Sequence, residues 1–385
     1  MTAAQTVANR LAFIRVFPKA PVGDSVAHML RTAFPEFEVD VLDVTALLKR
    51  RPDVMIMNGL ALLRDYGRDI LRGHRTVGEA FWGTSYLFTQ TKRLIQQTLA
   101  RRPGSYAFTF QLQSMIDAHT GGLPHFVYTD HTHLANLSYG RFNTHRLNST
   151  AWLAQERRLY QEANLVFTRS SNISHSLIEQ YGLPAEKVVC VYAGVNVPPQ
   201  PVGDNGRYHQ QHILFVGADW ERKGGPDLVQ AFQQVQKRLP QARLTIVGAA
   251  PELDAPNCRV LGQVPVADVS RYYQEASVFC LPTQLEPFGV AFIEAMAHRL
   301  PIVATAVGAI PDFVKEGYNG RLVAPNSVPE LTAALHTLLD NPQMCETYGA
   351  NGYQLFQDRY NWDRVGETIR QHVLASLPSS PSARK

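Results

Sequence analysis

The chain has 385 residues, of which 45% are hydrophobic and 18% are charged, and its formal net charge is +4. This composition is typical of a soluble globular protein and argues against a disordered or fibrous one, and the length favours two domains. Four scattered cysteines without a CxxC pair argue against a disulfide framework and a cysteine metal site.

The N-terminus lacks the apolar run of a signal peptide, because Arg10 and Arg15 interrupt it, and no run approaches the length of a membrane span. We therefore predict a cytoplasmic protein. Residues 1–200 hold 21 Lys and Arg against 15 Asp and Glu, a net of +6, which leaves −2 for the rest. The basic half fits an anionic membrane surface, an acidic substrate or nucleic acid, but no nucleic-acid motif accompanies it.

Short β-branched and aromatic runs alternate with longer amphipathic stretches along the chain. Runs this continuous predict parallel strands covered by helices on both faces, in βαβ units. The predicted strands are 11–17, 37–44, 106–111, 125–129, 165–168, 188–192, 212–216, 243–247, 278–281, 302–305 and 321–323.

The alternation pauses at residues 195–211, a stretch rich in Pro, Gly and polar residues that we interpret as an interdomain linker. The prediction is an α/β fold with two Rossmann-like doubly wound domains, 1–198 and 199–360, whose strand ends face a central cleft. A last helix, 361–377, has Trp362, Val365, Ile369 and Val373 on one face, and 378–385 is a tail.

The first loop, PVGDSVAHML, follows the first predicted strand. Gly23 permits close approach of a backbone, and Asp24 or Ser25 can cap the next helix. Capping alone explains most of this pattern.

Residues 81–102 combine aromatic and apolar bulk with Lys92, Arg93, Arg101 and Arg102. If the stretch is one helix, these cations could bind anionic lipid head groups at the inner face of the membrane. The alternative is an ordinary packed helix with a solvated basic end.

The segment HFVYTDHTHLANL places Asp130, His131 and His133 directly after a strand. Such residues can act as a base, a metal ligand or a hydrogen-bond donor to sugar. No third and fourth metal ligand lies nearby, so no metal is predicted. A satisfied loop histidine is the better interpretation of His133.

The segment ILFVGADWERKGGPDLVQAF places Arg222 and Lys223 between a strand and a helix N-terminus. A turn with glycines and cations before a helix can hold a pyrophosphate, although a basic surface turn is the alternative. The chain has neither a Walker loop nor a GxGxxG motif here, so a nicotinamide cofactor is not indicated.

The strongest signal is EPFGVAFIEAMA, in which Glu286 precedes a predicted helix at 290–298 and Glu294 lies inside it. Phe288 and Gly289 open the helix, so its first N–H groups can bind a phosphate or sugar hydroxyls. A solvated glutamate beside a helix dipole is the alternative.

Together these segments resemble the glycosyltransferase family 4 group of the GT-B fold. The resemblance rests on LFVGADWERKGG, LTIVGAAP, NCRVLGQV, FCLPTQLEPFGVAFIEAMAHRLPIVATAVGAIPDFV and GYNGRLV, within residues 213–323. YTDHTH and FTRSSNISHSLIEQYG resemble the family less closely. NWDRVGETI is similar to its terminal helix, which crosses back to the first domain.

The resemblance implies a retaining glycosyltransferase that moves a hexose-type sugar from a nucleotide diphosphate sugar to a hydroxyl of a glycan, lipid or small molecule. A UDP-sugar is favoured over a GDP-sugar, and neither a cofactor nor a metal is implied. The resemblance implies that Glu294 binds the ribose and that Glu286, with the backbone of Phe288 and Gly289, binds the donor sugar. It implies that Lys223 binds the diphosphate and that Gly23 contacts the donor phosphates. It also implies that His131 contacts the transferred sugar and that the loop at Val264 contacts the base.

The family usually has Arg at the position of Ala218. Either Arg222 supplies the second cation, or diphosphate binding depends on Lys223 and backbone N–H groups. An epimerase of the same fold and a non-catalytic nucleotide-sugar-binding protein are the alternative functions. The acceptor is not identified by these motifs.

Overall fold

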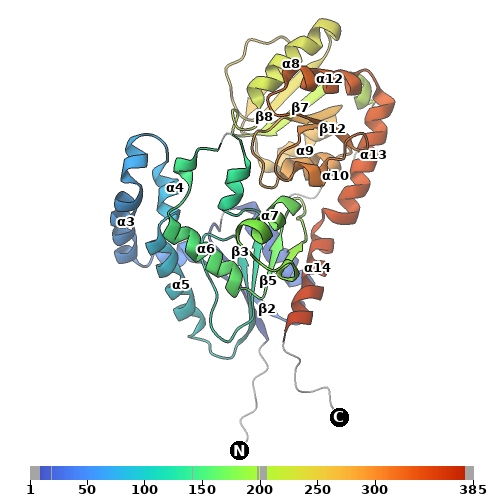
Figure 1. The fold of residues 1–385 in the computed structure, drawn as a ribbon. Helices are drawn as coiled ribbons and strands as arrows, with labels where there is room; N and C mark the ends of the chain where they lie inside the picture. The colour runs from blue at the N-terminus through green and yellow to red at the C-terminus, as the bar shows by residue number, and fades with distance from the viewer. Residues whose placement is uncertain (1–8, 19, 141, 197–198, 200–205, 378–385) are drawn as a thin grey trace, which may run out of the picture. The chain divides into compact units, whose positions relative to one another are not determined.

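The computed structural model describes residues 9–18, 20–140, 142–196, 199 and 206–377 (Figure 1). The predicted tail at 378–385 lies outside these residues, as do 197–198 and 200–205 of the predicted linker. The described residues form two compact units. One contains the chain up to Tyr192 together with the part from Trp362 onward, and the other is Ala193–Asn361.

The first unit contains a six-stranded parallel sheet in the order β2-β1-β3-β4-β5-β6. Each strand corresponds to one predicted apolar run, and β1 pairs with both neighbours through Leu11, which lies opposite Val39 and Phe108. The strands are β1 Arg10–Arg15, β2 Glu38–Asp43, β3 Tyr106–Leu112, β4 His125–Thr129, β5 Leu165–Thr168 and β6 Val188–Cys190.

Helices surround this sheet. Their bounds are α1 Pro21–Ala33, α2 Val44–Leu48, α3 Pro52–Leu71, α4 Val77–Trp82, α5 Ser85–Leu99, α6 Thr150–Glu162, α7 Ser171–His175 and α14 Trp362–Ser376, with short turns at η1 Leu134–Ser138, η2 Thr144–Arg146, η3 Ser176–Gln180 and η4 Ala185–Lys187.

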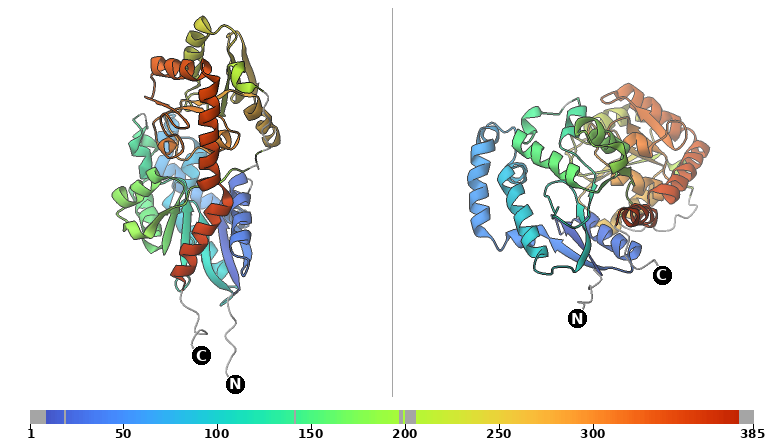
Figure 2. Two further views of the ribbon diagram at one scale, coloured as in Figure 1. Left: turned by 90° about the vertical axis from the view of Figure 1, so that its right-hand side faces the viewer. Right: turned by 60° about the horizontal axis from the view of Figure 1, so that its bottom comes forward.

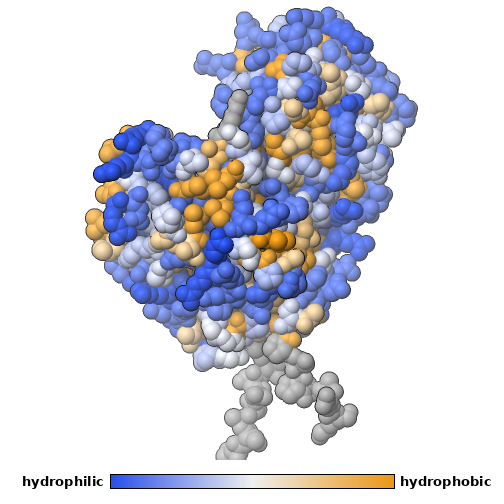
Figure 3. Space-filling view, viewed as in Figure 1, coloured by the Kyte–Doolittle hydropathy of each residue, from blue (hydrophilic) through white to orange (hydrophobic). Residues whose placement is uncertain are grey.

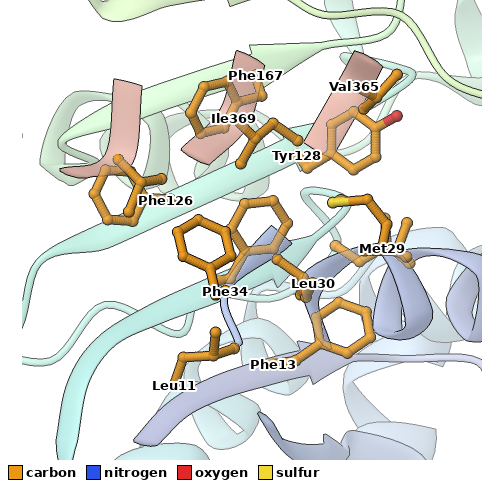
Figure 4. Close-up of a cluster of buried hydrophobic side chains, with 14 of the residues drawn as sticks. Leu11, Phe13, Met29, Leu30, Phe34, Phe126, Tyr128, Phe167, Val365 and Ile369 are labelled. Atoms are coloured by element: carbon orange, nitrogen blue, oxygen red, sulfur yellow. The ribbon is translucent and has the colours of Figure 1, made fainter. Parts of the chain in front are cut away.

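The core on one face of the sheet contains side chains of both α1 and α14, which come from opposite ends of the sequence. Phe13, Phe126 and Phe167 from the strands pack against Leu30 of α1 and Ile369 of α14 (Figure 4). The face of α14 that was predicted to be apolar is the buried one, and Val365, Ile369 and Val373 are each at most 1% exposed. Burying side chains of this size contributes about 1.5–3 kcal/mol each, so α14 is an integral part of the first unit.

The second unit contains a parallel sheet in the order β12-β11-β10-β7-β8-β9. Its strands are β7 His212–Gly217, β8 Arg243–Gly248, β9 Cys258–Gly262, β10 Val278–Leu281, β11 Ile302–Thr305 and β12 Gly320–Val323. Its helices are η5 Arg207–Gln210, α8 Gly225–Arg238, α9 Val266–Glu275, α10 Val290–Ala297, α11 Ile310–Phe313, α12 Val328–Leu339 and α13 Pro342–Arg359.

Strand β9 was not among the predicted strands. It lies at the edge of the sheet and is only partly buried, so its sequence lacks the continuous apolar run of an inner strand. The two doubly wound parallel sheets otherwise match the predicted α/β fold.

Two local predictions are wrong. Helix α1 begins at Pro21 and its N-cap is Ala20, so neither Asp24 nor Ser25 caps it. Residues 81–102 are not one helix, because α4 ends at Trp82 and Thr84 caps α5 by accepting a hydrogen bond from the Leu87 N–H at 3.1 Å.

Two of the four cations of residues 81–102 form ion pairs within the protein. Lys92 lies 2.5 Å from Asp117 and 3.2 Å from Glu162, and Arg102 lies 3.0 Å from Asp40. The apolar side chains of α5 pack into the core on the second face of the sheet. Residues 81–102 thus span the end of α4 and the packed helix α5, with Arg93 and Arg101 exposed, and lipid binding by this stretch stays a prediction. No helix in the described part of the chain is long and apolar enough to cross a membrane.

The strand order of each sheet identifies where ligands should bind. In the second unit β7 lies between β10 and β8, and in the first β1 lies between β2 and β3, so the order in which successive strands are added reverses beside β7 and beside β1. Open parallel sheets bind ligands outside the carboxyl ends of strands at such switch points.

Candidate active site

The loops after β7 and β10 come together at the switch point of the second sheet. They bring Lys223 against Glu286, and Lys223 Nζ forms an ion pair with Glu286 Oε2. Both side chains are largely buried, with 13% and 6% of their surface exposed. Two residues that are 63 positions apart in the sequence thus form one charged site.

Two glycines allow this close approach. Gly224 has φ +73°, and a Cβ there would overlap the carbonyl oxygen of Pro282 at the end of β10. Gly289 has φ +98°, and a Cβ there would lie 2.6 Å from the Phe292 ring. Glycine is therefore required at both positions. Gly289 is the N-cap of α10, whose first N–H groups lack acceptors within the helix.

Arg222 ties the two loops together. Its guanidinium donates hydrogen bonds of 2.9 Å to Asp219 and to the carbonyl oxygen of Leu285. Its own carbonyl accepts from the Gln284 N–H at 2.9 Å and from the Thr283 hydroxyl at 3.0 Å. These bonds make Arg222 a positioning residue for the Lys223–Glu286 pair, and its role as a second phosphate-binding cation stays a prediction.

Glu294 lies in α10 and meets a partner that the sequence did not indicate. The hydroxyl of Tyr273, from α9, donates to Glu294 Oε2 at 3.0 Å. Burial raises the pKa of Glu294 to about 7, although the Tyr273 hydroxyl acts in the opposite direction. A carboxyl in this state can accept hydroxyl donors of a ligand once it is ionised.

Phe288 and Val264 occupy the remaining predicted positions of this unit. Phe288 is 4% exposed and its ring packs edge-on against Phe313 at 5.3 Å, which leaves its backbone as the part able to meet a ligand. Val264 follows β9 in a partly exposed loop. Contact of this loop with the base stays a prediction.

In the first unit, His131 follows β4 as predicted. The carbonyl oxygen of His131 accepts a hydrogen bond from Thr129 Oγ1 at 2.6 Å, and its Nε2 accepts from the Asn136 side-chain amide at 3.0 Å. Burial lowers the pKa of His131, so the ring is neutral and carries its proton on Nδ1. Nδ1 is buried and has no hydrogen-bond partner among the described residues, and its contact with the transferred sugar stays a prediction.

His133 has a structural role instead. Its Nε2 accepts a hydrogen bond from the Asn148 backbone N–H at 2.6 Å, and its ring packs edge-on against Trp152 at 5.1 Å. Burial lowers the pKa of His133 to about 3. The interpretation of His133 as a satisfied loop histidine fits these contacts.

Glu156 lies beneath this loop, and sequence reasoning missed it. Its carboxyl accepts hydrogen bonds from Ser114 Oγ at 2.9 Å, from the His133 N–H at 3.2 Å and from the Tyr181 hydroxyl. The side chain is fully buried, and burial raises the pKa of Glu156 to about 7. In sequence it resembles any charged residue on a solvated helix face, so no local signal marks it.

The folded state favours the protonated form of Glu156, because the pKa is about 7 in the fold and about 4.3 in an unfolded chain. Its contribution to stability is full below pH 4.3 and is lost as the pH rises to about 7. We expect Glu156→Gln to flatten the fall of Tm over this window, with Glu179→Gln, an exposed carboxylate, as the control. Equal pH profiles for all three proteins would contradict a raised pKa.

Gly23 is not in a loop. It lies in the first turn of α1, where its N–H donates to Ala20 O at 2.9 Å. A Cβ at Gly23 would lie 3.1 Å from the Arg15 guanidinium, which pairs with Asp24 at 2.6 Å and Asp43 at 2.5 Å. The absent side chain accommodates Arg15, and the N–H is already used within the turn. Gly23 thus lies in helix α1 and not in the loop where the sequence placed it. Phosphate binding by Gly23 stays a prediction.

One group of potential metal ligands lies elsewhere in the first unit. Nδ1 of His74 and Nδ1 of His145 lie 3.7 and 3.6 Å from Asp69 Oδ1. The two imidazole rings stack 4.5 Å apart at 24°. A histidine binds a metal through a lone pair in the ring plane, and lone pairs of stacked rings do not converge. This arrangement does not fit a metal ion.

Two family models match the chain. Glycosyltransferase Family 4 matches residues 44–197, and Glycosyl transferases group 1 matches residues 210–341. Glycogen synthase of Mycobacterium tuberculosis is 26% identical over 235 residues, which are 58% of this chain and 57% of that protein. The chain thus spans little more than half the length of the curated relatives it matches.

Solved structures share the whole fold. Sucrose-phosphate synthase from Thermosynechococcus elongatus aligns with a TM-score of 0.71 at 17% identity over 97% of this chain and 100% of its own. Anabaena HepE in complex with UDP-glucose aligns with a TM-score of 0.63 at 16% identity over 96% and 100%. Both likenesses are to GT-B proteins, and the fold of this chain is GT-B.

Proposed function

The chain belongs to the group 1 and family 4 glycosyltransferases, and we propose that it transfers a hexose-type sugar from a nucleotide diphosphate sugar to an acceptor hydroxyl with retention of configuration. The observation that carries this proposal is the buried Lys223–Glu286 pair beside the N-terminus of α10 at a switch point. A cation and a helix N-terminus together favour a diphosphate.

The proposed reaction breaks the bond from the anomeric carbon to the diphosphate oxygen. Negative charge then grows on the diphosphate, and Lys223 with the N–H groups of α10 stabilises it. The acceptor hydroxyl attacks the anomeric carbon on the face that the diphosphate leaves, and its proton passes to a phosphate oxygen. Glu286 orients the sugar through hydroxyl contacts. No protein nucleophile is required because the acceptor attacks directly, and no metal is required because Lys223 and the helix N-terminus stabilise the diphosphate.

We propose a UDP-sugar as donor in preference to a GDP-sugar, with Glu294 accepting the ribose hydroxyls and the Val264 loop beside the base. The UDP-glucose complex of HepE, a protein of the same fold, supports this choice. The acceptor is a hydroxyl of a glycan, lipid or small molecule, which we assign to the 1–198 domain, and we propose that His131 of this domain contacts the transferred sugar. A cytoplasmic location, with peripheral contact to the inner face of the membrane, completes the proposal.

A thermal-shift screen of UDP, GDP and their sugars tests the donor. A ligand at 100 times its Kd should stabilise the folded state by about 2.7 kcal/mol. Stabilisation by GDP alone would reverse the choice of base, and no stabilisation by any nucleotide sugar would overturn the function. Incubating the stabilising donor without acceptor distinguishes the alternatives, since an epimerase forms an isomeric donor and a binding protein leaves the donor unchanged.

The two histidines after β4 should respond differently to substitution. His131→Ala removes the Nδ1 donor, and we expect about a tenfold loss of kcat/KM in the folded protein, the effect of about one hydrogen bond. His133→Ala leaves the Asn148 N–H without its acceptor, which should cost about 1–3 kcal/mol of stability and leave transfer by the folded protein near normal. Equal losses of kcat/KM in the two variants would contradict a specific role of His131 in contacting the sugar.

A further inference from the structure

Helix α3 exposes an apolar face on its outer side. Ile56, Leu60, Leu63 and Leu71 lie on one helical face, and 57–89% of each residue's surface is exposed. We call these four residues the outer stripe. Figure 3 shows apolar surface at the outer edge of the first unit, where Figure 1 labels α3. Single exposed leucines are common, but four apolar side chains on one face of a helix are typical of a docking surface.

The orientation of α3 is fixed by its inner face. Tyr66 donates to the carbonyl oxygen of Gly83 at 2.6 Å, and Asn58 donates to that of Phe81 at 3.0 Å. Leu62 packs in the same interface. The helix lies outside α5, farther from the sheet (Figure 2), and its main contacts are with α2, α4 and α5. Rotation cannot bury the outer stripe without breaking these contacts.

Cations surround the outer stripe. Residues 49–75 hold seven Lys or Arg and three Asp, a net of +4. Asp53 is paired with Arg51, and Asp65 with Arg64, whereas Lys49, Arg50, Arg68 and Arg72 are exposed and form no ion pair with any described residue. The uncompensated charge around the stripe is therefore positive.

A shallow groove extends the apolar surface. It lies between α3 and α5, has a volume of about 430 Å³ and is lined by Met57, Leu60, Ala61, Arg64, Ser85, Tyr86 and Thr89. Its apolar floor with a cation at the rim suits an acyl chain whose head group is anionic.

We propose that α3 docks this protein on an anionic lipid surface, with the outer stripe among the acyl chains and the surrounding cations at the head groups. An amphipathic helix with this division of residues lies in the plane of the membrane interface, with its apolar face about 5–10 Å deep. This proposal does not depend on the proposed sugar transfer.

A second copy of the chain fits this surface poorly. A 20-residue helix is about 30 Å long and about 10 Å wide, so its outer face offers roughly 300 Å², against about 800 Å² per partner in a stable interface. A symmetric dimer also places the same patch on both sides, which would bring like charges together. An anionic lipid surface complements both features.

Vesicle co-sedimentation of the full chain, without nucleotide, tests the proposal. We expect binding to vesicles of phosphatidylglycerol with phosphatidylcholine, weaker binding at high salt, and none to phosphatidylcholine alone. The triple variant I56Q/L60Q/L63Q should lose at least tenfold in partition coefficient, and R68S/R72S should lose about fivefold for each cation. The matched controls are Leu374→Gln, an exposed leucine of α14, and Lys237→Ser on α8.

Three results would overturn the proposal: wild-type protein that stays in the supernatant with anionic vesicles at low salt, a triple variant that binds as wild type does, or equal binding to neutral vesicles. Sedimentation velocity adds a fourth, since a wild-type dimer that the triple variant dissolves would assign the stripe to a second copy. The nucleotide thermal shift of the triple variant should equal that of wild type, so failure here is distinguishable from failure of the proposed transfer.

Discussion

Replacing Lys223 by alanine is expected to lower the rate of sugar transfer by about 10²–10³-fold, the usual effect of removing one group that stabilises charge in a transition state. Lys223 is the one predicted cation that the structure buries beside a carboxylate at the switch point. Single-turnover transfer at saturating donor would measure the effect. Lys237→Ala, which removes an exposed lysine of α8, is the matched control.

The comparison with Arg222 makes this prediction specific. Arg222 donates to Asp219 and Leu285, so Arg222→Ala should loosen the loop and reduce transfer by less than Lys223→Ala does. A larger loss in the Arg222 variant would reverse the ranking and show that Arg222 replaces the cation absent at Ala218.

The Lys223 variant also needs a control for folding, because it leaves the carboxylate of Glu286 buried without its partner. The double variant K223A/E286Q removes that charge and should recover the Tm. Recovery of the Tm would show that any loss of stability in Lys223→Ala comes from the unpaired carboxylate of Glu286.

Glu294→Gln is expected to weaken donor binding by about 10–100-fold, since a hydrogen bond to a charged group contributes about 1.5–3 kcal/mol. Fluorescence or calorimetric titration with the nucleotide alone would measure it. Glu275→Gln, an exposed carboxylate in the same unit, is the control. Unchanged affinity in the Glu294 variant would remove this residue from the ribose site.

Donor binding should also depend on pH through Glu294. Its pKa of about 7 means that the ligand-free carboxyl is half protonated near neutrality, whereas two ribose hydroxyls require an ionised acceptor. Affinity for the nucleotide should therefore rise with pH up to about pH 7 and then level off. Below that pH, binding of the nucleotide should release one proton from Glu294. Tyr273→Phe removes the hydroxyl that stabilises the carboxylate, so it should move this midpoint upward, and Glu294→Gln should abolish the dependence.

Residues with local signatures were predictable. The strands that lie inside each sheet, such as β4 and β10, need continuous apolar runs because helices cover both faces, and those runs are visible in the sequence. Lys223 and Glu286 were identified because each follows a strand and precedes a helix, a position that the order of local elements defines.

Partners that come from distant segments were not predictable. Glu156 and Tyr273 have ordinary helical neighbours in sequence, and only packing buries them and raises the pKa of Glu156 and Glu294. Burial depends on the whole sheet and its helices, since desolvation is a property of the surroundings of a group and not of its chain neighbours.

The sequence by itself determined the alternating strands and helices, the two parallel sheets and the loops that carry Lys223, Glu286 and Glu294, because each follows from local periodicity or a short motif. Only the tertiary structure decided that Asp24 pairs with Arg15 instead of capping α1, and that α3 exposes its outer stripe. Helical periodicity defines two faces of a helix, but which face meets solvent depends on the elements that pack against it.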